Sequence, residues 1–348
     1  MKNNVNFSTF ISFTAIMLLF ALSTQAKVWR VNNRAGVSAD FTALSAAISS
    51  PLVNQGDTIY LEASSGSHGT ITLNKMLTII GPGFYLAENP ETQADLNSAL
   101  IDILYINNGS QGSVIKGCTM ARVDINTSNI LFQGNLVWQN TTSSNYAMLL
   151  GANISNVIIR NNYIRQTYTT YGSEAIRAWQ TGTNNIIIQN NFIEITSTTS
   201  GRYALYFTSG FSGIIENNIL YGVTHVNNAE FHNNIITFGA FSCTNCNVTH
   251  NIGNSTQFGT INGNQQNVSP STIFLGATGN STDGQWRLRP GSPAIGTGVG
   301  GTDVGMFGGA TPYKLSGLPN IPAIYEINHN IDYENQLLEI EFSVKSHN

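Results

Sequence analysis

The sequence predicts an all-β protein built as a parallel β-helix, and three observations lead to this fold class. The phrase NVIIRNNYI at residues 156–164 returns as NIIIQNNFI at residues 185–193. Related phrases place an asparagine in the same slot at intervals that vary between 16 and 29 residues. Apolar and polar residues alternate around each slot, which is the pattern of a strand. Strands that recur at a short, variable period are typical of stacked coils in which one corner loop changes length.

The repeated slot predicts a ladder of asparagine side chains at one bend of the coil. Asparagine suits such a bend because it tolerates left-handed backbone, and its amide can bond to the amides above and below. The slot holds Asn135, Asn162, Asn191, Asn218, Asn234 and Asn251, with Cys118 in the same place one coil earlier.

A further short strand is expected in each coil at YAMLLG (146–151), EAIRAW (174–179) and YALYFT (203–208), giving three strands per coil. Both ends of such a stack need a cover. DFTALSAAISSP predicts a short amphipathic capping helix with Asp40 as its N-cap and an apolar face of Phe41, Leu44, Ala47 and Ile48. PAIYEI at 322–327 and LLEIEFSV at 337–344 predict a strand pair, or a tail, as a candidate cover for the far end.

The N-terminus has the layout of a cleaved secretory signal. Lys2 precedes an apolar run from Phe10 to Leu22, and small residues precede Ala26. An uncleaved anchor is the alternative, but the run is shorter than the ~20 residues that a spanning helix needs. We therefore expect a signal peptide at 1–26, a β-helix with its cap at 27–315 and the strand pair or tail at 316–348. The expected location is secreted or at the cell surface, with the periplasm as another destination.

Composition restricts the partners. Charged residues make up only 10% of the chain, the net charge is -4, and no cluster of Lys and Arg appears along the sequence. Binding to nucleic acid is therefore not expected. Cys118, Cys243 and Cys246 are too few for a disulfide framework, and the CxxC formed by the last two has no further ligands for zinc. These two are expected to be buried small residues or a pair bonded after export.

Three stretches resemble a known family. They are the VIIRNNYI-type phrase, DTIYLEASSGSHGTITLNKMLTIIGPG at 57–83 and RPGSPAIGTGVGGTDVGMFGG at 289–309. Together they resemble secreted bacterial right-handed β-helix proteins of the pectate-lyase-like superfamily over roughly residues 40 to 310. The resemblance implies that the second stretch forms opening coils and the third closing coils. The superfamily includes lyases, hydrolases, epimerases and proteins without known activity, so the resemblance does not select a reaction.

The resemblance also implies a binding face beside the variable loops, on the strand that follows each loop. Alternation directs Leu149, Arg177, Tyr206 and His225 outward on successive coils, spanning ~10 Å between Arg177 and His225. Arg177 could hold a uronate while Tyr206 or His225 moves a proton. Further candidate substrate-binding residues are Arg165, Tyr168, Tyr171, Glu174, Glu194 and Arg202.

A structural interpretation stands beside this one. Outward Arg and Tyr residues on a β-helix more often form solvated cross-strand pairs, for example Arg165 with Glu194. His232 and His250, on the opposite side, are expected to be structural, and Asp124 is expected to be a lone outward carboxylate. The adjacent Asp pair of polygalacturonase-like hydrolases and a calcium-binding acidic cluster are missing from the sequence. No metal or cofactor is expected, and GTGVGG at 296–301 is interpreted as turn glycines.

The sequence thus supports two functions. The first is an exported protein that interacts with extracellular carbohydrate, with a polysaccharide lyase-like activity as its catalytic form. The alternative is a non-catalytic structural, adhesive or protein-binding module. Whether the protein is an enzyme stays open at this point.

Overall fold

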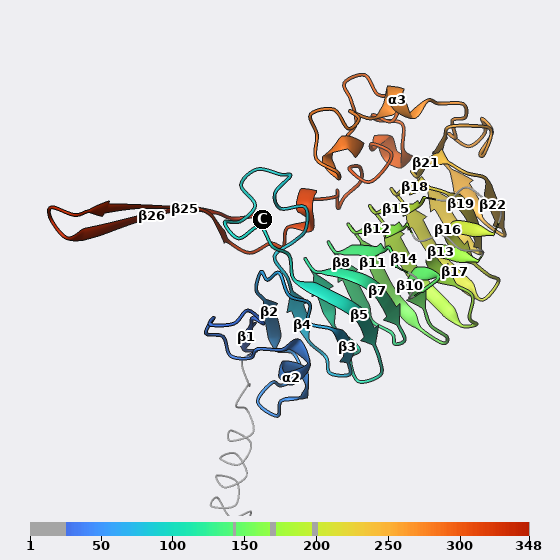
Figure 1. The fold of residues 1–348 in the computed structure, drawn as a ribbon. Coiled ribbons are helices and arrows are strands. Elements are labelled where there is room, and N and C mark those ends of the chain that lie inside the picture. Colours follow the sequence, from blue (N-terminus) through green and yellow to red (C-terminus); the bar gives the residue numbers. More distant parts are fainter. Residues whose placement is uncertain (1–25, 142–143, 168–171, 197–200, 348) are drawn as a thin grey trace, which may run out of the picture.

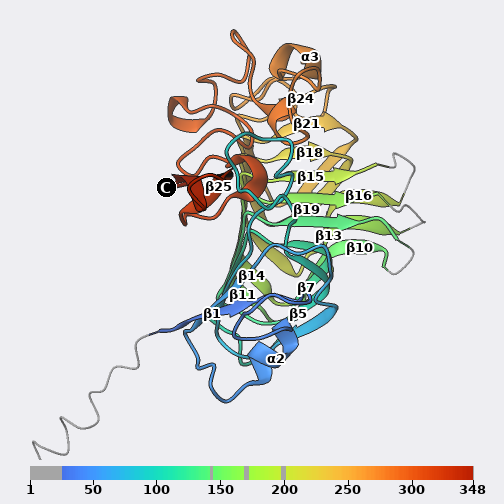
Figure 2. The same ribbon diagram turned by 60° about the vertical axis from the view of Figure 1, so that its left-hand side comes forward.

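Parallel strands of successive coils hydrogen-bond along the stack and form the right-handed parallel β-helix that the sequence predicts. The computed structural model describes residues 26–141, 144–167, 172–196 and 201–347. The predicted signal peptide at 1–26 lies outside these residues except for Ala26. Figure 2 shows the strands of neighbouring coils stacked above one another.

One face of the helix is a ten-stranded parallel sheet, called here the first sheet. It contains, in order, β1 (Val28–Val31), β2 (Thr58–Leu61), β4 (Thr78–Ile80), β6 (Val114–Lys116), β8 (Ile130–Gln133), β11 (Ser155–Arg160), β14 (Thr183–Gln189), β17 (Phe211–Glu216), β20 (Ala229–His232) and β23 (Asn247–Thr249).

The second sheet has two arms that share β7. The front arm contains β3 (Thr70–Leu73), β5 (Leu100–Ile106), β7 (Thr119–Ile125), β10 (Tyr146–Leu150), β13 (Ser173–Ala178), β16 (Arg202–Phe207), β19 (Val223–Asn227) and β22 (Phe241–Thr244). The side arm contains β9 (Leu136–Gln139), β12 (Tyr163–Gln166), β15 (Phe192–Ile195), β18 (Ile219–Tyr221), β21 (Ile235–Phe238) and β24 (Ile252–Gly253). The variable loops connect the side arm to the front arm, as expected.

The capping helix is confirmed at α2 (Leu44–Ser49), which lies at the N-terminal end of the stack (Figure 1). Leu44, Ala47 and Ile48 are buried in the main core, as their spacing predicts. The predicted N-cap is wrong, because Ala43 occupies that position. Asp40 instead accepts a hydrogen bond from the backbone nitrogen of Arg30 at 2.8 Å, and so ties the approach to the helix onto β1.

The predicted asparagine ladder is confirmed and is one coil longer than expected. Each carboxamide oxygen accepts bonds from the backbone and side-chain nitrogens of the preceding asparagine; Asn162 N and Nδ2 lie 2.9 and 3.0 Å from Asn191 Oδ1. The ladder starts at the backbone nitrogen of Cys118 and ends at Asn264. Its members are inaccessible or nearly so, which makes the ladder a hydrogen-bonded part of the interior.

The first asparagine of each NN pair has a separate role that the sequence analysis did not predict. Left-handed backbone occurs at this residue and not at the ladder asparagine, with φ of 56° at Asn161 and 54° at Asn190. These side chains point outward and bind chain from the C-terminal region. Asn161 Nδ2 donates to Thr311 O at 2.9 Å, and Asn190 Nδ2 donates to Met306 O and Gly308 O at 3.0 and 2.7 Å.

The chain from 270 to 317, called here the strap, adds no parallel strand to the stack, so the expected closing coils at 289–309 are not formed. It contains α3 (Pro270–Ile273) and the short 3-10 turns η1 (Gly284–Trp286), η2 (Val299–Gly301) and η3 (Leu315–Gly317). The strap packs on the outer surface of the side arm, where it completes a second apolar cluster. That cluster includes Phe84, Leu136, Tyr163, Phe192, Ile219, Ile235, Ile273, Phe274, Val304, Met306 and Tyr313.

The predicted C-terminal strand pair is present as an antiparallel hairpin of β25 (Ala323–Asp332) and β26 (Leu337–Lys345). It projects from the body in Figure 1, and its apolar side chains are exposed, with Phe342 and Ile340 each at 58%. The hairpin therefore does not cover the far end of the stack, contrary to expectation. There Phe258 packs against Phe231 and Phe241 instead.

Cys243 and Cys246 form a disulfide across the turn after β22 and are half-buried, whereas Cys118 is a buried free thiol. Within the described ranges, no helix has the length and apolar character needed to cross a membrane.

Candidate functional site

The outward residues of the front arm form the column that alternation predicts. Leu149 pairs in register with Arg177, Arg177 with Tyr206, and Tyr206 with His225. Inward neighbours such as Ile176 are fully buried. A second column, Tyr146, Glu174 and Tyr203, runs beside the first one. The outer stripe is defined here as Arg122, Asp124, Tyr146, Glu174, Arg177, Tyr203, Tyr206 and His225.

Aromatic rings make up the part of the outer stripe towards the C-terminal end of the stack. The rings of Tyr203 and Tyr206 lie 4.8 Å apart between centroids, and Tyr206 stacks on His225 at 5.5 Å with an interplanar angle of 29°. His225 Nδ1 lies 2.8 Å from the hydroxyl of Ser242 on the next strand. These contacts hold the Tyr206 and His225 rings in one partly exposed surface.

Arg177 lies at the centre of the outer stripe and forms an ion pair with Glu174. Its Nε donates to Glu174 Oε2 at 2.8 Å, and its Nη2 donates to the same carboxylate and to Gly172 O at 2.9 Å. The guanidinium also faces the rings of Tyr146 and Trp179, at 5.0 and 5.2 Å from their centroids. Trp179 is 54% exposed, so its ring extends the aromatic surface into solvent.

Glu174 is a buried carboxyl group of the outer stripe with a strongly shifted pKa. Its side chain is buried at the start of β13, and this burial raises its pKa from 4.5 to about 7, although Arg177 opposes the change. A carboxyl group with this pKa can both donate and accept a proton near neutral pH. Glu174 is a substrate-binding candidate from the sequence, but its ion pair with Arg177 is not among the expected contacts.

Asp124 is not the lone carboxylate that the sequence analysis expects. Arg122 Nε and Nη2 donate to its two oxygens at 2.8 and 2.5 Å, and Tyr146 Oη lies 3.4 Å from Oδ2. The Arg122 guanidinium faces the Tyr146 ring at 4.6 Å. Tyr146 therefore lies between the Arg122–Asp124 and Arg177–Glu174 pairs. The spacing of Arg122 and Asp124, two residues apart on one strand, could have indicated this pair.

Arg165 and Glu194 lie on the side arm, whereas the outer stripe lies on the front arm. They form the cross-strand ion pair that the structural interpretation expects, with Arg165 Nε 2.5 Å from Glu194 Oε2. The Arg165 guanidinium also faces the ring of Trp138 at 5.4 Å. These two side chains are thus already paired with each other.

The remaining candidates come from the variable-loop segments of the sequence or directly follow them. Tyr168 and Tyr171 lie outside the described residues. Arg202 begins β16, where it pairs in register with Ser173 and so lies at the loop edge of the outer stripe.

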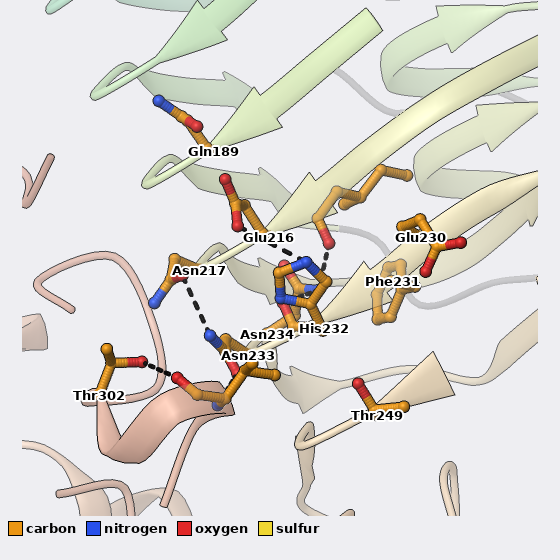
Figure 3. Close-up of polar contacts among 12 residues, drawn as sticks. Gln189, Glu216, Asn217, Glu230, Phe231, His232, Asn233, Asn234, Thr249 and Thr302 are labelled. Atoms are coloured by element: carbon orange, nitrogen blue, oxygen red, sulfur yellow. Dashed lines mark hydrogen bonds and ion pairs between the residues drawn. The ribbon is translucent and has the colours of Figure 1, made fainter. Parts of the chain in front are cut away.

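His232 lies on the first sheet, beside the strap, as Figure 3 shows. Its Nε2 lies 3.6 Å from Glu216 Oε2 on the neighbouring strand. Asn233 Nδ2 is 3.4 Å from Asn217 Oδ1, and Asn233 Oδ1 accepts the backbone nitrogen of Val299 at 2.9 Å. A cleft of about 250 Å³ lies between these residues and the strap. The contacts fit the structural role expected for His232.

The described ranges contain no group of three or more His, Cys, Asp or Glu side chains arranged to hold a metal ion. Comparisons of the chain with protein-family models, with curated proteins and with solved structures find no match.

Proposed function

We propose that this protein is exported and binds extracellular carbohydrate along the outer stripe. The observation that carries the proposal is the arrangement of aromatic rings and charged hydrogen-bonding groups on consecutive coils of one rigid sheet. Two features support export. The sequence at 1–26 has the layout of a secretory signal, and Cys243 and Cys246 form a disulfide.

The spacing of the coils suits a glycan chain that runs parallel to the helix axis. Neighbouring coils are ~4.8 Å apart, which is close to the length of one sugar unit. The C–H face of a pyranose can pack on the ring of Tyr206, which stacks on His225, or on the exposed ring of Trp179, which faces Arg177. Hydroxyl groups of the sugar can then bond to His225 and to the charged pairs.

A lyase-like reaction is the second candidate, and the raised pKa of Glu174 favours it. β-Elimination from a uronate requires a base to remove the proton next to the carboxylate and an acid to protonate the leaving oxygen. Arg177 would neutralise the uronate, and Tyr206, His225 and Glu174 would move the two protons. The Arg177–Glu174 ion pair would have to open to bind the substrate carboxylate.

The test is a titration of uronate-containing and neutral oligosaccharides into the protein. Calorimetry measures binding, and absorbance detects the unsaturated sugar ends that a lyase-like reaction would produce. Wild-type protein is expected to bind at least one glycan. Arg177→Ala combined with Tyr206→Ala is expected to abolish binding, because it removes the central cation and the central ring. The melting temperature should change by only a few degrees, since Tyr206 lies outside the core and the buried carboxyl group of Glu174, whose pKa is already raised to about 7, can take up a proton when Arg177 is removed.

The matched control combines Arg289→Ala with Tyr221→Ala, which removes the same residue types from other surfaces and should leave binding unchanged. Unsaturated ends would establish the lyase-like reaction, and binding without them the non-catalytic form. A wild-type protein that binds no glycan would contradict the proposal in favour of a structural or adhesive module.

A further inference from the structure

A second cleft lies between the first sheet and the C-terminal end of the strap. It has a volume of about 400 Å³. Its floor is formed by the last outward residues of β6, β8 and β11, namely Lys116, Gln133 and Arg160, which pair in register. Its wall is formed by residues 310–314 and 317–320.

Three cations line this cleft, from positions far apart in the sequence: Lys116, Arg160 and Lys314. No Asp or Glu occurs among the described residues that line it. Arg160 Nε and Nη2 donate to the neutral acceptor Gln133 Oε1 at 3.1 and 3.0 Å. Lys314 Nζ donates to Asn320 Oδ1 at 2.6 Å. None of these cations forms an ion pair within the described part of the chain, whereas Arg122, Arg165 and Arg177 all do.

The cleft is held open by the protein itself. Asp283 is fully buried, and its Oδ2 accepts bonds from Tyr313 Oη at 3.2 Å and from the backbone nitrogen of Ser316 at 2.6 Å. Asn161 Nδ2, which also lines the cleft, donates to Thr311 O at 2.9 Å and so ties the wall to the first sheet. A site that needs no rearrangement loses less entropy when a ligand binds.

We propose that this cleft binds a small organic anion, of about monosaccharide size, through a carboxylate, sulfate or phosphate group. The volume lies within the range of ~300 to 1,000 Å³ typical of small-molecule sites. Lys116 and Arg160 are separated by one intervening strand, ~10 Å along the stack, so an oxyanion can contact either cation and a sugar-sized body can span both. Pro312, Leu318 and Pro319 supply an apolar wall for that body.

Burial lowers the pKa of Lys116, because partial removal from water disfavours the charged ammonium group. An anion in the cleft would supply this charge. The site is separate from the outer stripe, and its test does not depend on whether the outer stripe binds glycan.

The experiment is calorimetric titration at low ionic strength of full-length protein carrying Arg177→Ala and Tyr206→Ala, which removes the proposed glycan contacts of the outer stripe, with four probes: galacturonate, N-acetylglucosamine 6-sulfate, glucose 6-phosphate and glucose. At least one of the anionic sugars is expected to bind, and glucose is not. Raising the salt concentration should weaken binding, because screening acts on the charge interaction. The probe that binds most tightly identifies which of the three oxyanions the cleft prefers.

Arg160→Gln and Lys116→Met should each weaken binding by about tenfold or more, as expected when one charge-assisted hydrogen bond is lost. Arg160→Lys keeps the positive charge and should therefore retain more of the wild-type affinity than Arg160→Gln does. Arg289→Gln is the matched control on an exposed cation and should leave anion binding unchanged; the cleft and control substitutions are all added to the Arg177→Ala and Tyr206→Ala protein, so that binding to the outer stripe does not contribute. Absence of anion binding, equal binding of glucose, or binding that survives both cleft substitutions in folded variants would overturn the proposal.

Discussion

At the residue scale, the two asparagines of each NN pair perform different tasks. The second one points inward and joins the ladder, while the first has left-handed backbone and binds the strap. The ladder could be predicted from the spacing of the asparagines and from the alternation of apolar and polar residues around them, both of which are local properties of the sequence. The expectation of left-handed backbone at the ladder asparagine is wrong, because both residues of the pair are asparagines that tolerate this conformation better than most residues, and spacing does not distinguish them.

Asn191→Leu should lower the free energy of unfolding by a few kcal/mol, because it removes a fully buried amide whose neighbours then lose their partners. Asn191 Nδ2 donates to Ile159 O and Gln189 O at 2.9 Å, and leucine can replace neither bond. Urea denaturation measures the change. The exposed Asn184→Leu in the same coil is the control and should change stability by less than ~0.5 kcal/mol. Equal effects of the two substitutions would mean that the ladder is not buried.

Glu174→Gln should change the pH dependence of stability. In the folded protein the pKa of Glu174 is raised from 4.5 to about 7, so the stability associated with the protonated form is present below 4.5 and is lost as pH rises towards 7. Glutamine stays neutral throughout. The melting temperature of the variant relative to wild type should therefore increase from about pH 5 to about pH 8. A difference that stays constant or decreases would show that Arg177 keeps the carboxyl group ionised.

At the element scale, the structure separates strands that build the stack from a hairpin that does not. In β25 and β26 one face carries Ile327, Ile331, Leu338, Ile340 and Phe342, and these side chains are 47% to 60% exposed. The alternation of LLEIEFSV correctly predicted a strand. It could not reveal whether the apolar face has a partner within the chain, because alternation reports a preference for burial and not the surface that provides it.

Combining Ile340→Ser with Phe342→Ser should change the melting temperature little, because both side chains are exposed in the folded protein. Ile193→Ser, at a fully buried position of β15, should lower the free energy of unfolding by ~2 to 5 kcal/mol. Differential scanning calorimetry of the two variants gives the comparison. A large loss of stability in the hairpin variant would mean that the hairpin covers the core after all.

At the scale of the whole molecule, the coils could be predicted and the strap could not. The asparagine position of each coil recurs after 16 to 29 residues, so the repeat can be recognised in the sequence. Contacts of the strap, such as Asn190 with Gly308, join residues 118 apart and have no period. The same reason hid the cationic cleft, since Lys116, Arg160 and Lys314 meet only through the fold. The outward column of Arg177, Tyr206 and His225 was predicted, but its ion pairs were not.

Tryptophan fluorescence tests most directly whether the outer stripe binds glycan. Trp179 is 54% exposed and lies beside Arg177, whereas Trp138 is 38% exposed and belongs to the side arm. If a glycan binds along the outer stripe, a titration should change the emission of wild-type protein and of Trp138→Phe, and the change should disappear in Trp179→Phe. An emission change that persists in Trp179→Phe and is lost in Trp138→Phe would place binding on the side arm and contradict the account.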